Sequence, residues 1–153
     1  MNMKIFIASD HRGYYLKEKI KKWFSEWHYH YEDFGAFKLN SKDDYPDFIS
    51  QVAKKVSKDP QNSKGIVLGA SGQGEAILAN KYKGVRAVVY YGGPEDIIRL
   101  SREHNNANVL SLGASFLKEK NAKEAVRLWL KTNFSKNARH VRRLNKIKKI
   151  EGK

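Results

Sequence analysis

Short apolar runs alternate with amphipathic stretches along almost the whole of this chain. Five runs have the size and composition of β-strands: residues 4–8, 29–34, 65–68, 85–90 and 109–112. Stretches with apolar residues at helical spacing lie between and after them: residues 14–27, 46–59, 74–80, 94–103, 121–131 and 138–150. This alternation predicts an α/β fold, with a parallel sheet that helices cover on both faces.

Length and composition limit what the chain can be. Its 153 residues suit one domain, and 41% hydrophobic and 12% aromatic residues are enough for a packed core. No apolar run approaches the roughly 20 residues of a membrane helix, and the first residues lead into a strand without a signal-peptide pattern. We therefore expect a cytoplasmic protein. The absence of cysteine excludes disulfides, cysteine-ligated metal and a cysteine nucleophile.

The net charge of +14 suits anionic partners such as nucleic acid, a membrane surface or phosphorylated metabolites. It equally suits a lysine-rich background without functional meaning. Residues 136–153 carry half of the charge, a net +7. Within this segment Arg139 and Arg143 lie four residues apart on one helix face, where two guanidinium groups form either a phosphate clamp or a solvated basic face.

Ligands of parallel sheets bind outside the carboxyl ends of the strands, so the loops after the strands are the places to look for a site. The first loop reads Ser9-Asp10-His11-Arg12-Gly13. Asp10 suits the N-cap of the next helix, and the acid–base pair of Asp10 and His11 also suits proton transfer or anion binding. His28 and His30 have no third ligand nearby, so we expect them to face solvent rather than a metal.

The loop after the third strand, residues 69–75, reads Gly-Ala-Ser-Gly-Gln-Gly-Glu. Gly72 and Gly74 allow a tight turn whose backbone N–H groups converge on an anion. The glycine spacing fits neither the phosphate loop of nucleotide hydrolases nor the dinucleotide fingerprint. Glu75 is either an ordinary acid in a first helical turn or a base beside donors that stabilise an oxyanion. The residues alone leave both readings open.

His104 follows a predicted helix and precedes the fifth strand, in a segment rich in asparagine. Asparagine tolerates left-handed backbone and forms local hydrogen bonds. By itself this segment predicts only a polar turn.

Taken together, these segments resemble the ribose-5-phosphate isomerase B family and its relatives, the galactose-6-phosphate isomerase subunits. The resemblance runs from about residue 4 to residue 150 and rests on the order and spacing of short blocks. The blocks are Ser9-Asp10-His11 with Gly13, Asp44-Tyr45-Pro46, residues 65–75, Ala79-Asn80-Lys81, Gly84-Val85-Arg86-Ala87, residues 103–107, and Arg139-His140 with Arg143. The resemblance implies one sugar-phosphate isomerase domain over residues 1–153: a Rossmann-like three-layer sandwich with a five-stranded parallel sheet, and a basic C-terminal helix and tail in residues 136–153.

The resemblance also implies an activity, the interconversion of D-ribose 5-phosphate and D-ribulose 5-phosphate through a cis-enediolate, as in the pentose phosphate pathway, without metal or cofactor. It implies a homodimer with shared active sites. The implied catalytic residues are Glu75, as proton acceptor, and His104, as the acid that opens the furanose ring. The implied substrate-binding residues are Asp10, His11, Ala70, Ser71, Gly72, Gln73, Gly74, Asn105, Arg139 and Arg143.

Two positions distinguish this chain within the pattern. One branch of the family uses a cysteine base where this chain has Gly69, and another carries a glutamate at the position of Glu75, so the chain resembles the glutamate branch. Family members commonly have a substrate-contacting arginine where this chain has Ser115. Losing one charge-assisted contact costs about 1.5–3 kcal/mol if nothing replaces it. Arg142 or a neighbouring lysine is the expected replacement.

The Ser115 departure keeps a hexose 6-phosphate isomerase, of the galactose 6-phosphate type, as an alternative. A basic nucleic-acid-binding protein is a more distant one, because the C-terminal segment lacks a reading motif and has no aromatic residue after Phe134. We expect a phosphorylated sugar as the partner, with no specific nucleic acid and no membrane.

Overall fold

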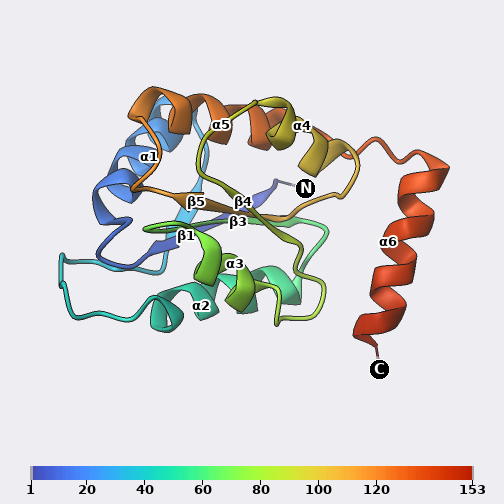
Figure 1. The fold of residues 1–153 in the computed structure, drawn as a ribbon, viewed down its shortest axis with the longest axis horizontal. Helices are drawn as coiled ribbons and strands as arrows, with labels where there is room; N and C mark the ends of the chain where they lie inside the picture. Colours follow the sequence, from blue (N-terminus) through green and yellow to red (C-terminus); the bar gives the residue numbers. More distant parts are fainter. Residues whose placement is uncertain (1, 153) are drawn as a thin grey trace.

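The computed structural model describes residues 2–152, and its five strands form one all-parallel sheet in the order β2-β1-β3-β5-β4 (Figure 1). The strands are β1 (Lys4–Ser9), β2 (Tyr31–Asp33), β3 (Ser63–Gly69), β4 (Ala87–Tyr90) and β5 (Val109–Gly113). The helices are α1 (Tyr14–Glu26), α2 (Tyr45–Lys58), α3 (Gln73–Ala79), α4 (Asp96–Glu103), α5 (Glu119–Lys131) and α6 (Ala138–Glu151). The predicted α/β sandwich with a five-stranded parallel sheet is therefore confirmed, and the ends of the predicted elements shift by no more than two residues.

Helices cover both faces of the sheet, and a separate hydrophobic cluster lies under each layer (Figure 1). α1, α4 and α5 pack on one face, where Phe24 and Trp129 are fully buried. α2 and α3 pack on the other face, around Val52. In the central strand β3, Ile66 belongs to the first cluster and Val67 to the second, as the alternation of side chains in a strand requires. Both faces of β3 are thus buried, which explains the unbroken apolar run of residues 65–69.

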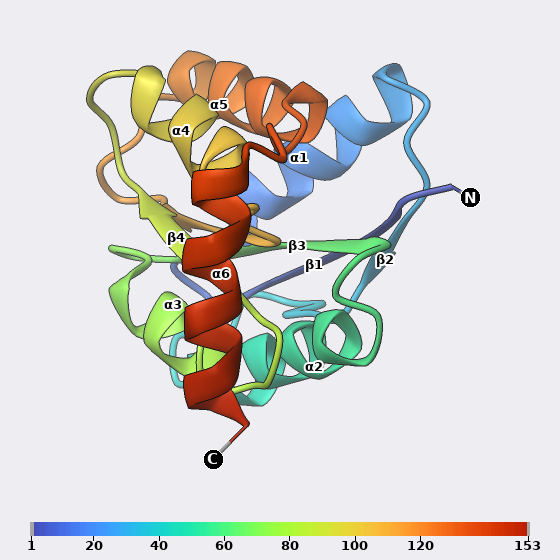
Figure 2. The ribbon, with the colours of Figure 1, turned by 90° about the vertical axis from the view of Figure 1, so that its right-hand side faces the viewer.

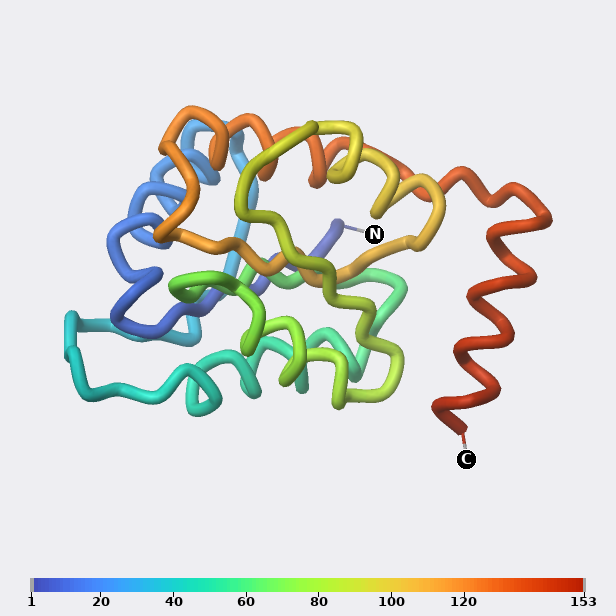
Figure 3. The backbone as a smooth tube through the Cα atoms, in the orientation of Figure 1, coloured from blue at the N-terminus to red at the C-terminus, as the bar shows by residue number. Residues whose placement is uncertain are grey.

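α6 stands apart from this sandwich. Figure 3 shows the chain leaving α5 through residues 132–137 before it turns into the last helix, and Figure 2 shows α6 running across the edge of all three layers. A groove of about 710 Å³ lies between α6 and residues that precede strands, among them Met3, Pro60 and Arg86. α6 therefore lies at the amino edge of the sheet, where the strands begin, and the loops that follow the strands lie at the opposite, carboxyl edge.

Among the side chains of α6, only that of His140 is buried, whereas the apolar residues Val141, Ile147 and Ile150 are exposed. Of the helices in residues 2–152, none combines the length and apolar character needed to cross a bilayer.

Candidate active site

Asp10 closes the turn that follows β1. Its Oδ1 atom accepts hydrogen bonds from the backbone N–H groups of Arg12 (2.9 Å) and Gly13 (3.2 Å). Gly13, rather than Asp10, is the N-cap of α1, so the capping role considered for Asp10 is wrong. The buried carboxylate instead orders the backbone that follows His11.

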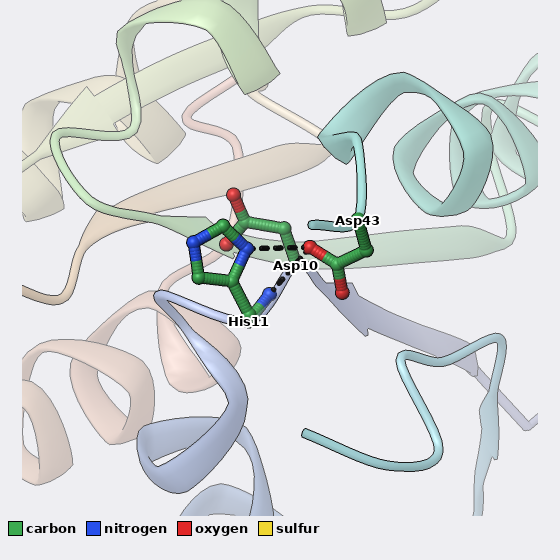
Figure 4. A group of neighbouring side chains, drawn as sticks. All are labelled: Asp10, His11 and Asp43. Atoms are coloured by element: carbon green, nitrogen blue, oxygen red, sulfur yellow. Dashed lines mark hydrogen bonds and ion pairs between the residues drawn. The ribbon is translucent and has the colours of Figure 1, made fainter. Parts of the chain in front are cut away.

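Asp43 fixes the side chain of His11. A single oxygen of Asp43, Oδ1, accepts hydrogen bonds from the backbone N–H of His11 (3.0 Å) and from its Nδ1 (2.6 Å), as Figure 4 shows. The Asp43 side chain is 7% exposed, which shields this contact from water. Because the proton on Nδ1 is held by a carboxylate, Nε2 on the far side of the ring is left for a ligand.

Asp10, His11 and Asp43 also have the spacing of a metal site, since one ligand atom from each lies within 4.8 Å of the others. The bond between His11 Nδ1 and Asp43 Oδ1 already pairs two of these atoms. Asp43 received no site role from the sequence, because an acid shortly before Pro46 is typical of a helix start. Its partner lies 32 residues earlier.

The turn after β3 is fastened to β5. Gly72 has a φ of +78°, in the left-handed region that favours glycine, and its carbonyl accepts a hydrogen bond of 2.7 Å from the hydroxyl of Ser111. The backbone N–H of Ser115 donates to the carbonyl of Ala70 (3.0 Å). These bonds hold the turn at the carboxyl edge of the sheet, beside Asp10 and His11.

The same turn offers unused donors. In the part of the chain that the structure describes, the backbone N–H groups of Ser71, Gly72 and Gly74 have no acceptor within hydrogen-bond distance. Donors that converge from one turn stabilise negative charge on a bound oxygen.

Glu75 lies directly behind this turn and is 4% exposed. Burial raises the pKa of its carboxyl group, and the negative charge of Asp10 adds to the rise, whereas a hydrogen bond from its own backbone N–H opposes it. A carboxylate with a raised pKa is a stronger base than an exposed one. Glu75 is therefore a buried carboxyl group with a raised pKa, next to the N–H groups of Ser71, Gly72 and Gly74.

Tyr45, the first residue of α2, lines the turn from the other side. A Cβ atom on Gly74 would lie 2.7 Å from the hydroxyl oxygen of Tyr45, so a glycine at this position leaves room for the phenol ring. Asp44-Tyr45-Pro46 carried part of the resemblance, but no residue pattern singled out Tyr45.

The remaining predicted residues lie at the amino edge of the sheet. His104 follows α4, and its ring stacks on that of His140 in α6, with centroids 4.1 Å apart and an angle of 17° between the planes. Nε of Arg139 lies 3.4 Å from Nε2 of His140. Burial, together with the charges of His104, Arg139 and Arg143, lowers the pKa of His140. We call His104, Asn105, Arg139, His140 and Arg143 the amino-edge cluster.

One chain therefore carries two separate groups of predicted site residues. Asp10, His11, the turn 70–74 and Glu75, which we call the carboxyl-edge cluster, lie together. The amino-edge cluster lies at the edge where β5 begins, and the five residues of β5 span roughly 16 Å. A group that donates or accepts a proton must come within about 3 Å of the reacting atom. The two clusters of one chain consequently do not act on the same small molecule.

Ser115 has a neighbour that the sequence did not suggest. Nη2 of Arg12 donates a hydrogen bond of 3.2 Å to the hydroxyl of Ser115. Within one chain, the cation that reaches Ser115 is thus Arg12, and not Arg142, which lies on α6 at the other edge of the sheet.

The chain is similar to proteins of known structure and activity. A family model described as Ribose/Galactose Isomerase matches residues 5–147. A curated relative from Mycoplasma genitalium, named probable ribose-5-phosphate isomerase B, is 39% identical over 151 residues, which cover 99% of this chain and 97% of the relative.

Solved structures agree with this similarity. Ribose-5-phosphate isomerase B from Mycoplasma genitalium with bound ribulose-5-phosphate has a TM-score of 0.95 at 38% identity, and the match covers 100% of this chain and 99% of that one. Ribose-5-phosphate isomerase B from Clostridium thermocellum has a TM-score of 0.90 at 41% identity and covers 98% of both chains.

Proposed function

This chain belongs to the ribose/galactose isomerase family, and on that basis we propose that it interconverts D-ribose 5-phosphate and D-ribulose 5-phosphate. The observation that carries the proposal is the buried carboxylate of Glu75 beside the free N–H groups of the turn 70–74. The relatives are named ribose-5-phosphate isomerase B, and one of them holds ribulose-5-phosphate. These names favour a pentose phosphate over a hexose 6-phosphate, and an enzyme over a nucleic-acid-binding protein.

The chemistry follows from the carboxyl-edge cluster. Glu75 takes the proton from C2 of the open-chain aldose, the C–H electron pair forms the C1–C2 double bond, and the carbonyl electrons move to O1. The N–H groups of Ser71, Gly72 and Gly74 stabilise the charge on the cis-enediolate, which is absent from the substrate itself. Glu75 then returns the proton to C1 while the O2 proton moves to O1, which gives the ketose. Asp10 and His11 bind the sugar phosphate beside this centre.

A complete site requires a second copy of the chain. The amino-edge cluster holds the groups expected to open the furanose ring, His104 with Asn105, and to bind the phosphate, Arg139 and Arg143. Within one chain it is separated from Glu75 by the length of β5. α6 projects from the body with apolar side chains exposed, which is typical of a surface that another chain covers. We therefore propose a homodimer in which each site combines the two clusters from different subunits.

The proposal extends to residues 1–153 as a single isomerase domain with a basic C-terminal helix. It also assigns the reaction to the cytoplasm, in line with the expectation from the sequence.

The activity is tested with purified protein and ribose 5-phosphate, with formation of ribulose 5-phosphate as the readout and galactose 6-phosphate as the competing substrate. Glu75→Gln should remove nearly all turnover while ribose 5-phosphate still binds in calorimetry. Glu124→Gln, an exposed acid on α5, is the matched control and should keep wild-type turnover. Wild-type protein without ribose 5-phosphate isomerisation would overturn the function, and an active Glu75→Gln variant would overturn the assigned base.

The shared site is tested by co-expression of Glu75→Gln and His104→Gln chains that carry different tags. In a mixed dimer, one site combines both defects and the other combines the intact Glu75 with the intact His104. The two variants, each inactive alone, should therefore yield mixed dimers with about half of the wild-type activity. Inactive mixed dimers would show that both residues act within one chain.

A further inference from the structure

The side chain of Arg12 extends across the carboxyl-edge cluster. Its backbone N–H is held by Asp10, and its guanidinium reaches Ser115, which is 103 residues away in the sequence (3.2 Å from Nη2 to Oγ). Ser115 is itself bonded to the carbonyl of Ala70. Arg12 therefore joins the loops after β1 and β5, and Ser115 in turn ties them to the loop after β3, next to Glu75.

The guanidinium of Arg12 remains available to a ligand. The Arg12 side chain is exposed, and among residues 2–152 no carboxylate lies within ion-pair distance of it. Its hydrogen bond to Ser115 uses one of five N–H donors, so a planar fork of further donors points into solvent. The Ser115 hydroxyl sets the position of this fork without neutralising its charge.

A cation at this place offsets the negative charge of the carboxyl groups around it. Asp10, Asp43 and Glu75 place three carboxyl groups within the same small region. A sugar phosphate brings up to two further negative charges to it. Without a cation from this side, the approach of the phosphate ester would be opposed by like charges.

We propose that Arg12 binds the phosphate group of the substrate, from the same chain that supplies Glu75. The inference rests on the proposed sugar-phosphate activity and names a binding residue that this activity did not include. The family resemblance implies that other members commonly have an arginine at the position of Ser115, where it contacts the substrate. Here the guanidinium reaches the same place from position 12, and the short side chain of Ser115 leaves room for it.

The test compares Arg12→Ala with Arg127→Ala, which removes an exposed arginine from α5 and so lowers the net charge equally. Arg12→Ala should raise KM for ribose 5-phosphate about ten-fold and leave kcat within about three-fold. It should weaken competitive inhibition by inorganic phosphate by a similar factor, because the lost contact is to the phosphate. Arg127→Ala should change neither constant.

A second variant restores the guanidinium from the other loop. Arg12→Ala combined with Ser115→Arg should bring KM and the inhibition constant of phosphate back toward wild-type values. Unchanged KM and unchanged phosphate inhibition in Arg12→Ala would overturn the inference, and so would a raised KM with phosphate inhibition intact. If the wild-type protein did not isomerise ribose 5-phosphate, the proposed function would fail, and calorimetric binding of inorganic phosphate would still decide the role of Arg12.

Discussion

The carboxylate of Glu75 occupies the space that a side chain at Gly69 would need. A Cβ atom on Gly69 would overlap Oε1 of Glu75 and lie 2.8 Å from Oε2. The side chain of Glu75, which comes from α3, can therefore take this position only because residue 69 at the end of β3 is glycine. In the cysteine branch of the family, which this cysteine-free chain does not resemble, the implied base projects from position 69 itself. The two branches thus bring different side chains to one point in space.

Gly69→Ala should disable the enzyme without unfolding it. The new methyl group displaces the carboxylate of Glu75, and a shift of about 1 Å in a catalytic group can cost on the order of 100-fold in rate. We expect kcat to fall by about that factor with KM for ribose 5-phosphate little changed. Gly152→Ala, where a Cβ has ordinary contacts at 3.7 Å, is the control. Wild-type kcat in Gly69→Ala would contradict the assigned geometry.

Glu75→Gln should be more stable than the wild type at alkaline pH. The folded protein raises the pKa of Glu75, so the charged form is less favourable in the folded than in the unfolded state. The wild type therefore loses stability as the pH rises through the raised pKa, by about 1.4 kcal/mol for each unit between the two pKa values. Thermal unfolding followed by circular dichroism should show a higher Tm for Glu75→Gln at pH 8 and a smaller difference near pH 5. Equal Tm values for the two proteins at every pH would show that burial does not raise the pKa of Glu75.

The same rise in pKa predicts the pH dependence of activity. Only the deprotonated carboxylate accepts a proton, so kcat/KM of the wild type should fall as the pH drops through the raised pKa of Glu75. A pH profile of kcat/KM whose only inflection on the acidic side lies near 4.5, the ordinary pKa of a glutamate, would contradict this prediction.

Asp43→Asn should weaken the substrate site through His11. The substitution removes the charge from a bond of 2.6 Å and frees the proton on Nδ1 to exchange between the two ring nitrogens. We expect kcat/KM to fall about ten-fold, mainly through KM, and the ¹⁵N spectrum of His11 to show mixed tautomers. Asp44→Asn, an exposed neighbour, should leave both unchanged. A raised KM with an unchanged His11 spectrum would show that Asp43 does not act on the substrate site through His11.

Lys64→Met should stabilise the protein most at low pH. Burial, with a contribution from the charge of Arg102, lowers the pKa of Lys64 to about 7. Protonated Lys64 therefore destabilises the folded state below pH 7, and the penalty disappears as the pH rises from 7 toward 10.5. Methionine also loses the hydrogen bond from Nζ to the carbonyl of Leu130, which costs about 1 kcal/mol at any pH.

The measurement for Lys64 is urea unfolding at pH 6 and at pH 9.5. The gain in unfolding free energy of Lys64→Met over the wild type should shrink by a few kcal/mol between these values. Lys54→Met, on the exposed side of α2, should show no such change. A gain that is independent of pH would mean that Lys64 is not titrating in this range.

The sequence was sufficient for the fold because strand and helix periodicities are local signals. The apolar pattern of residues 65–68 or of 121–131 needs no knowledge of the partner element. The site residues Glu75 and His104 were ambiguous by that criterion, and only the order of several short blocks suggested their roles. Their distribution over two edges of the sheet follows from the direction of β5.

The contacts that the sequence did not predict join distant loops. His11 meets Asp43 across 32 residues, and Arg12 meets Ser115 across 103. Neither pair has a periodicity or a spacing that identifies it, because each depends on how the loops at the carboxyl edge are folded. The stacking of His104 on His140 is unpredictable for the same reason, since it depends on the direction of α6 after residues 132–137.

α6 buries one side chain of its own, His140, and neither hydrophobic cluster of the sandwich includes any of its residues. In the shared site that we propose, a chain that ends before residue 138 would keep its own Glu75 and still deprive the neighbouring subunit of its phosphate-binding arginines. The intact copy in such a mixed pair would complete the site of the shortened one, but its own site would lack Arg139 and Arg143. Damage at the end of the coding sequence would thus appear in the active site that holds Glu75 of the undamaged subunit, whereas the site that holds Glu75 of the damaged one would stay complete.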